Sequence, residues 1–141
     1  LLVERSSLGQ SFSDRGDLED HIGYDALTRR ARERGLQPPD GGQLTAGDVF
    51  RLAAAGNPVA RDLAEEILDI TAMAVAAMVI VLDPQLVVIG STEPARDSAM
   101  VPDVQRRLQG RIIHVPRIAA AHHGADAVLV GVGRLAAERA G

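Results

Sequence analysis

Residues 57–90 read NPVARDLAEEILDITAMAVAAMVIVLDPQLVVIG, and this stretch decides the fold. Asn57 is a favourable N-cap and Pro58 is tolerated in the first helical turn, so a long helix begins here. Asp83 precedes a proline and therefore ends the helix, since that position avoids helical geometry. The aliphatic run Leu86–Ile89 ends at a glycine, which is typical of a buried parallel strand entering a turn. A helix followed by such a strand indicates an α/β protein.

The long helix changes character along its length. Its first half is amphipathic, whereas residues 70–82 are apolar apart from Thr71. At about 1.5 Å per residue this run covers about 20 Å, short of the roughly 30 Å core of a bilayer, so we expect no membrane span. A helix end that is apolar all round must be covered by other elements. We therefore expect a missing partner subdomain or a second copy of the chain to cover it, and we predict a homodimer.

The remaining segments extend the same pattern. Apolar spacing predicts a helix over residues 18–34 that Gly35 stops, and Thr45 with Asp48 three residues later predicts the start of a short helix. No internal repeat or linker divides the chain, so we expect one domain over residues 1–141. The other predicted elements are a strand at residues 1–4, a helix around 101–109, a strand at 112–118, and a helix at 125–139 in which Gly131 and Gly133 allow close packing.

Composition narrows the functional classes. The chain has 141 residues, 46% of them hydrophobic, with no cysteine and a formal net charge of -4. The absence of cysteine excludes disulfides and thiolate metal sites and is compatible with a cytoplasmic location, which we expect. The net charge draws the chain towards neither nucleic acid nor acidic membrane. A cluster of arginines at 29, 30, 32 and 34 is either a solvated helix face or a phosphate or DNA contact.

Four ordered segments resemble one family. They are DVFRLAAAGNPVAR at residues 48–61 together with the long helix, LDPQLVVIG at 82–90, the Leu18-Glu19 region through Ala31, and Pro116-Arg117-Ile118 with Gly124 to Gly131. In order and spacing they are similar to the C-terminal half of ROK proteins (repressor, open reading frame, kinase). The resemblance implies the C-terminal lobe of an actin/hexokinase-like (ribonuclease H-like) fold, in which helices pack on a small sheet.

The resemblance also implies two functional alternatives. One ROK branch phosphorylates sugars with ATP, and another senses sugars as a repressor with a winged-helix DNA-binding domain. No residues here match the family's phosphate loop or catalytic aspartate, so we expect no catalytic residue and no cofactor in this chain. We interpret it as the effector-binding and dimerisation portion of a regulator that senses a sugar or sugar phosphate, with DNA bound only through a domain absent here. The alternative is a C-terminal fragment of a glucokinase-like, ATP-dependent kinase.

The zinc loop of the family is altered. Its pattern C-x-C-G-x-x-G-C-L-E corresponds here to SFSDRGDLE at residues 11–19, in which Ser11, Ser13 and Asp17 replace the cysteines. Serine hydroxyls neither ionise at neutral pH nor offer soft sulfur, so they are poor zinc ligands. We therefore expect residues 1–16 to be a degenerate zinc-loop region without metal. We also expect the four histidines to be surface or interface residues rather than a metal site.

Three residues remain as binding candidates. Glu19 matches the family glutamate that hydrogen-bonds sugar hydroxyls, although a glutamate in a first helical turn is also favoured by the helix dipole. Gly90 and Ser91 follow the predicted strand where active members have a Gly-Gly turn that receives the adenine nucleotide. They either bind a phosphate or form a plain strand-to-loop turn. Asp83 is either a lone acid or a helix-end residue, and its place before Pro84 favours the second.

Overall fold

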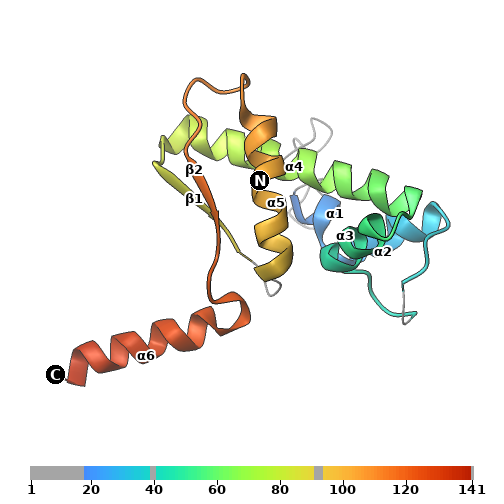
Figure 1. The fold of residues 1–141 in the computed structure, drawn as a ribbon. Coiled ribbons are helices and arrows are strands. Elements are labelled where there is room, and N and C mark those ends of the chain that lie inside the picture. Colours follow the sequence, from blue (N-terminus) through green and yellow to red (C-terminus); the bar gives the residue numbers. More distant parts are fainter. Residues whose placement is uncertain (1–17, 39–40, 91–93, 141) are drawn as a thin grey trace, which may run out of the picture.

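One long helix organises the chain. The computed structural model describes residues 18–38, 41–90 and 94–140, and the elements follow one another as helices and two strands. The first three helices gather along one end of α4, while α5 and the sheet lie along its other end (Figure 1). The elements in order are α1 Leu18–Ile22, α2 Tyr24–Glu33, α3 Ala46–Ala54, α4 Pro58–Leu82, β1 Leu86–Ile89, α5 Pro94–Leu108, β2 Arg117–Ala120, the 3-10 turn η2 Gly124–Asp126 and α6 Ala127–Ala140.

The ends of α3 and α4 are fixed by the residues that the sequence indicated. The Thr45 hydroxyl accepts from the Asp48 N–H at 3.0 Å, and the Asp48 carboxylate accepts from the Thr45 N–H at 3.0 Å, so the capping box is complete. The Asn57 side chain accepts from the Ala60 N–H at 3.0 Å. Asp83 caps the other end of α4 in a left-handed conformation with φ 44°, and its N–H donates to Val79. The helix-end interpretation of Asp83 is confirmed.

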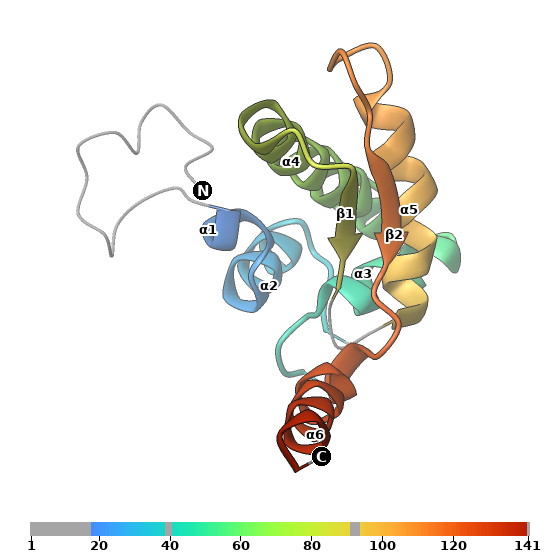
Figure 2. The same ribbon diagram turned by 90° about the vertical axis from the view of Figure 1, so that its left-hand side faces the viewer.

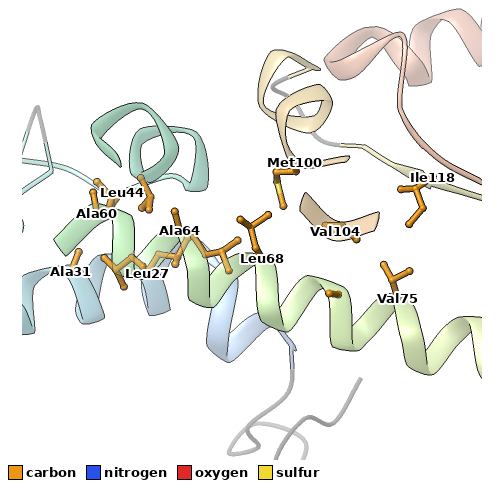
Figure 3. Close-up of a cluster of buried hydrophobic side chains, with 14 of the residues drawn as sticks. Leu27, Ala31, Leu44, Ala60, Ala64, Leu68, Val75, Met100, Val104 and Ile118 are labelled. Carbon is orange, nitrogen blue, oxygen red and sulfur yellow. The ribbon is translucent and has the colours of Figure 1, made fainter. Parts of the chain in front are cut away.

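The first half of α4 forms a core with α2 and α3. Leu27, Leu44, Val49 and Leu63 have 0% exposure there. Figure 3 shows Leu27, Ala31 and Leu44 gathered near Ala60 and Ala64 of α4. The buried Thr28 hydroxyl accepts from the Leu44 N–H at 2.7 Å, which attaches the loop after residue 40 to α2. Burial of these aliphatic groups supplies about 25 cal/mol per Å² of apolar surface and is the main stabilising term here.

The second half of α4 packs against α5, which in turn covers the sheet. Val75 and Val79 are buried on α4, as are Met100 and Val104 on α5. Figure 3 shows Val75, Met100, Val104 and Ile118 in this part of the core. The strands are parallel, with Leu86 opposite Arg117 and Val88 opposite Ala119. Side chains alternate between faces, so Ile118 points to α5 while Leu86 and Val88 lie on the uncovered face.

An arginine on α5 ties the two helices together. Arg107 donates to Asp69 of α4 at 2.7 Å and pairs with Glu65 of α4, and its side chain is only 13% exposed. Burial alone lowers the pKa of Arg107, but the hydrogen bond to Asp69 and the charges of Glu65, Asp69 and Asp103 outweigh it, so the pKa lies above the ordinary value. The ion pairs therefore keep this guanidinium charged at the helix interface.

Four sequence expectations were wrong in detail. The predicted helix over 18–34 is two helices separated at Gly23, where a close approach to Glu19 requires a glycine. The strand β1 is half exposed rather than buried, with Val88 56% exposed. The helix expected around 101–109 begins at Pro94, because proline fits the first helical turn. The fourth concerns the second strand, and the strand expected at residues 1–4 lies outside the described residues.

The second strand begins later than the alternation of apolar residues suggested. It was predicted at 112–118 and runs from Arg117 to Ala120. Pro116 lacks the N–H that a strand needs for pairing. Arg117 is the first residue after it, and its N–H donates to the Gln85 carbonyl at 3.1 Å. Parallel pairing therefore starts only past the proline.

The last helix lies apart from the rest of the molecule. Figure 2 shows α6 set away from α4, α5 and the sheet. A Cβ added at Gly131 or Gly133 would meet nothing within 4 Å, so the expected close packing at these glycines is not present within the chain. Within the described residues, no helix combines the length and the apolar character that crossing a membrane requires.

Candidate functional site

Glu19 lies at an open polar pocket on the side of the molecule formed by α1 and α2. The pocket has a volume of about 220 Å³. Beside it lies a second open hollow of about 490 Å³ that shares Asp25, Arg29 and Gln43 with it. We call the two together the α2 pocket. It is lined by Glu19, Asp20, Gly23, Asp25, Ala26, Thr28, Arg29, Arg32, Glu33, Gly41, Gly42 and Gln43.

A glycine sets the position of Glu19. The Gly23 N–H donates to the Glu19 carbonyl oxygen at 2.8 Å, which closes the last turn of α1. A Cβ at residue 23 would lie 2.5 Å from that carbonyl oxygen and 2.5 Å from the Oε1 atom of Glu19. Carbon and oxygen atoms do not approach so closely, so a side chain at residue 23 would displace Glu19. The missing side chain therefore holds the Glu19 carboxylate at the pocket wall.

The opposite wall of the pocket is held by the loop after residue 40. The Gln43 amide donates to the Asp25 carboxylate at 2.7 Å, and Arg32 donates to the Gly42 carbonyl at 3.3 Å. The hydrogen bond from Leu44 to the buried Thr28 hydroxyl anchors this loop from below. Carboxylates, an amide and a guanidinium thus face one opening. Such a set both donates and accepts hydrogen bonds, as a ligand rich in hydroxyl groups requires.

The arginine cluster of α2 is divided among several roles. Arg30 donates to the His21 carbonyl at 2.8 Å and pairs with Glu66, and Arg34 pairs with Glu66 at 2.8 Å. These contacts hold α1 and α2 on α4. Arg29 is exposed and lines both parts of the α2 pocket. Part of the cluster is therefore structural, and Arg29 is the member best placed to meet a ligand.

Gly90 lies at the carboxyl end of β1 and has a packing role. The Ala121 N–H donates to the Ile89 carbonyl at 2.7 Å, which brings the ends of the two strands together. A Cβ at residue 90 would lie 2.9 Å from the Ala121 Cβ, so a larger residue would push the strands apart. In open α/β sheets the carboxyl ends of strands are where ligands bind. Packing alone accounts for this glycine, and nucleotide binding by it stays a prediction.

The other residues predicted at these sites are placed as follows. Gly90 is not among the residues that line the α2 pocket, so the structure does not bring it together with Glu19. Ser91 lies outside the described residues, as do Ser11, Ser13 and Asp17 of the altered zinc loop. The His122 and His123 rings meet edge to face with centroids 5.0 Å apart. Within residues 18–38, 41–90 and 94–140, no group of three or more histidine or acidic residues is close enough to hold a metal ion.

Two polar residues of the α2 pocket were missed from the sequence. Asp25 stands in the first turn of α2, where an acidic residue is explained by the helix dipole alone. Gln43 follows two glycines in a loop. Only the folded loop brings the Gln43 amide to Asp25, 18 residues away in the chain, so no local pattern could have shown the pair.

Comparison with known proteins gives one family. The sequence pattern of the ROK family matches residues 13–139. No protein of curated function matches the chain significantly.

Solved structures agree in fold. The ROK hexokinase from Thermus thermophilus is 26% identical with a TM-score of 0.66, over 93% of this chain and 43% of that one. A ROK family glucokinase from Streptomyces griseus, solved with glucose and AMPPNP, is 22% identical with a TM-score of 0.66, over 86% of this chain and 45% of that one. A protein from Cytophaga hutchinsonii described as a sugar kinase is 17% identical with a TM-score of 0.68, over 94% of this chain and 47% of that one.

This chain spans less than half the length of these three structures. The order of helices and strands, the small parallel sheet and the match over residues 13–139 together confirm the family resemblance and the actin/hexokinase-like fold class. The chain belongs to the ROK family.

Proposed function

We propose that this chain is the effector-binding and dimerisation portion of a cytoplasmic ROK-family transcriptional regulator, that its effector is a sugar or a sugar phosphate, and that the chain is not catalytic alone. The observation that carries the proposal is the α2 pocket, in which Glu19, Asp25, Arg29 and Gln43 share one opening. Carboxylate oxygens accept hydrogen bonds from sugar hydroxyls, and a guanidinium can meet either a hydroxyl or a phosphate.

The regulator is preferred to the kinase because of two departures from the family pattern. The turn after Gly90 continues as Ser91-Thr92-Glu93 in place of the Gly-Gly turn that receives nucleotide in active members. A carboxylate at residue 93 would repel the phosphates of ATP. The loop at residues 11–19 has lost its thiolate ligands. A protein under selection for kinase activity would be expected to keep both features.

Ligand binding tests the first part of this proposal. Calorimetric titration of the chain with glucose, galactose, N-acetylglucosamine and their 6-phosphates should give binding to at least one of them. Substitution Glu19→Ala or Asp25→Ala should weaken that binding by about ten-fold, equivalent to ~1.4 kcal/mol, because each removes an acceptor for a hydroxyl. Glu138→Gln, on α6 and away from the pocket, is the matched control and should leave affinity unchanged. Binding that ignores both pocket substitutions would contradict the assignment of this site.

The second candidate is a fragment of an ATP-dependent sugar kinase. It is favoured by the names of the similar structures, a hexokinase and a glucokinase that binds glucose and AMPPNP. Under this alternative Gly90 would lie beside the nucleotide. Titration with AMPPNP in the presence of each sugar, and a coupled assay for ADP release, separate the two. Nucleotide binding or sugar-dependent ADP release would establish the kinase alternative, whereas sugar binding without either supports the regulator.

Dimerisation is proposed for the exposed end of α4 and the uncovered side of β1. We call this surface the α4–β1 face, formed by the exposed side chains of Ile80, Val81, Leu82, Leu86 and Val88. No charged residue occurs from residue 70 to residue 82, as is typical of the core of an interface between subunits. Sedimentation velocity should show a dimer that Val81→Lys converts to a monomer. Leu135→Lys on α6 is the control, and it should not change the dimer.

A further inference from the structure

The last helix carries an apolar surface of its own. Val128, Leu129, Val132 and Leu135 of α6 are exposed by 74%, 72%, 60% and 56%. Their spacing of one, three and three residues places them along one side of the helix, and we call them the α6 stripe. The helix extends from η2 and stands clear of the sheet and of α4 and α5 (Figures 1 and 2). The α6 stripe is therefore separate from the α4–β1 face.

Such a helix is not stable by itself. Isolated helices shorter than about 12–15 residues are marginal in water, and α6 has 14 residues. Two of them are glycines, each of which costs about 1 kcal/mol relative to alanine in a helix interior. The first seven residues, 127–133, contain no charge that could favour solvation. The helix therefore needs a surface to pack against, and its own chain leaves the α6 stripe uncovered.

The family match indicates what that surface is. The ROK pattern extends to residue 139, so α6 is an integral part of a ROK domain rather than an added tail. The similar structures contain more than twice the matched length, because only 43–47% of each is covered. Most of a ROK fold thus lies outside the 141 residues of this chain.

We propose that the α6 stripe docks onto that remaining part of a ROK fold, through an aliphatic surface lacking charge, whether the two parts belong to one polypeptide or to two. This inference rests on the proposed role of the chain as one part of a ROK domain, and it is independent of the ligand of the α2 pocket. A second copy of the chain is the competing occupant, and it is assigned instead to the α4–β1 face.

Hydrogen–deuterium exchange on the 141-residue chain gives the first test. The amides of Leu63–Val79 in α4 should be strongly protected, while those of residues 128–139 should exchange within about ten-fold of the unstructured rate, because nothing covers the helix. Protection of α6 that rises with protein concentration and is lost in Leu135→Lys would show that a second copy is the occupant. Protection independent of concentration would show that α6 needs no partner. Either result would overturn the proposal.

A helix exchange in a complete ROK protein gives the second test. The segment of the Thermus thermophilus ROK hexokinase that aligns with Ala127–Ala140 is replaced by these 14 residues. The graft should fold, and changing Val128, Val132 and Leu135 to Asn within it should lower Tm by about 10 °C. Arg134→Gln with Glu138→Gln in the same graft is the matched control, because these two charged side chains lie outside the α6 stripe.

Each result of the exchange decides the matter. A graft whose Tm falls with the Asn substitutions and not with the Gln substitutions supports docking through the α6 stripe. Equal Tm values for the two variants, or an unfolded graft that still carries the native stripe, would overturn it. Failure here leaves sugar binding at the α2 pocket intact, and failure to bind sugar leaves this docking intact, so the two proposals are tested separately.

Discussion

The Gly23 Cα atom lies against the Glu19 carboxylate so closely that a Cβ at residue 23 would be 2.5 Å from the Glu19 Oε1 atom. Gly23→Ala should therefore displace Glu19 and strain the turn between α1 and α2. Overpacking of this kind costs about 1–3 kcal/mol, which denaturant unfolding would measure. Gly42→Ala is the matched control, since a Cβ there meets nothing within 4 Å. Equal stabilities for the two variants would show that Glu19 moves without cost.

The buried hydroxyl of Thr28 should be more important than its size suggests. Thr28→Val keeps the shape but removes the acceptor for the Leu44 N–H, which lies 2.7 Å away in a buried position. An unsatisfied buried donor costs about 1–3 kcal/mol, so the free energy of unfolding should fall by that amount. Thr71→Val is the control, because the Thr71 hydroxyl only donates to the Ile67 carbonyl within α4. A loss of similar size in both variants would contradict this account.

The capping box of α3 should make stability depend on pH. Partial burial raises the pKa of Asp48, but hydrogen bonds from Thr45 and Arg51 and the Arg51 charge outweigh it, so the folded pKa lies below the unfolded value of 3.8. A lowered carboxyl pKa means that the stabilisation is fully present above pH 3.8 and is lost as pH falls through the folded pKa.

Comparison of the chain with Asp48→Ala across pH measures this effect. At pH 7 the variant should lose about 1 kcal/mol, typical of a lost cap, as measured by urea unfolding. The difference should shrink once pH drops below 3.8. Asp62→Ala, which removes an exposed carboxylate of α4, should show no such narrowing. A difference for Asp48→Ala that stays constant down to pH 2 would argue against an ionised cap.

Arg107 should stabilise the packing of α5 on α4, whereas its neighbour should not. Arg107→Met removes contacts with Asp69 and Glu65 from a side chain that is 13% exposed. We expect a loss of about 1–2 kcal/mol in the free energy of unfolding, because both carboxylates lose a well-placed partner. Arg106→Met is the control: Arg106 is 67% exposed and pairs with Asp103 of its own helix, so its loss should be below about 0.5 kcal/mol. The opposite ranking would contradict the role given to Arg107.

Local signals in the sequence were sufficient for much of the fold. The starts of α3 and α4 depend on Thr45, Asp48 and Asn57, whose side chains bond backbone groups two or three residues away, so the sequence reveals them directly. The ends at Gly35, Gly56 and Asp83 are equally local, because each adopts a positive φ. The boundaries that failed depend on tertiary contacts. The break at Gly23 requires the position of Glu19, and β2 begins only where β1 offers partners.

The candidate site was less predictable than the fold. Glu19 came from the family resemblance, and its neighbours Asp25 and Gln43 came only from the structure, since their contact joins residues 18 apart. The exposure of the α4–β1 face and of the α6 stripe is also a property of the assembled chain. A run of aliphatic residues indicates that burial is needed, but it does not say whether the cover is in the same chain.

The long helix α4 fixes the rotational phase between the two parts of the molecule. The first three helices pack on its first half, while α5 packs on its second half and carries the sheet. An α-helix turns by about 100° per residue, so a single residue inserted near Asp69 would swing the sheet, with its α4–β1 face, through about a quarter of a circle relative to the α2 pocket. Insertions of one residue at this point should therefore be far more damaging than conservative substitutions there, and the spacing from Leu63 to Val79 acts as a built-in gauge of relative orientation.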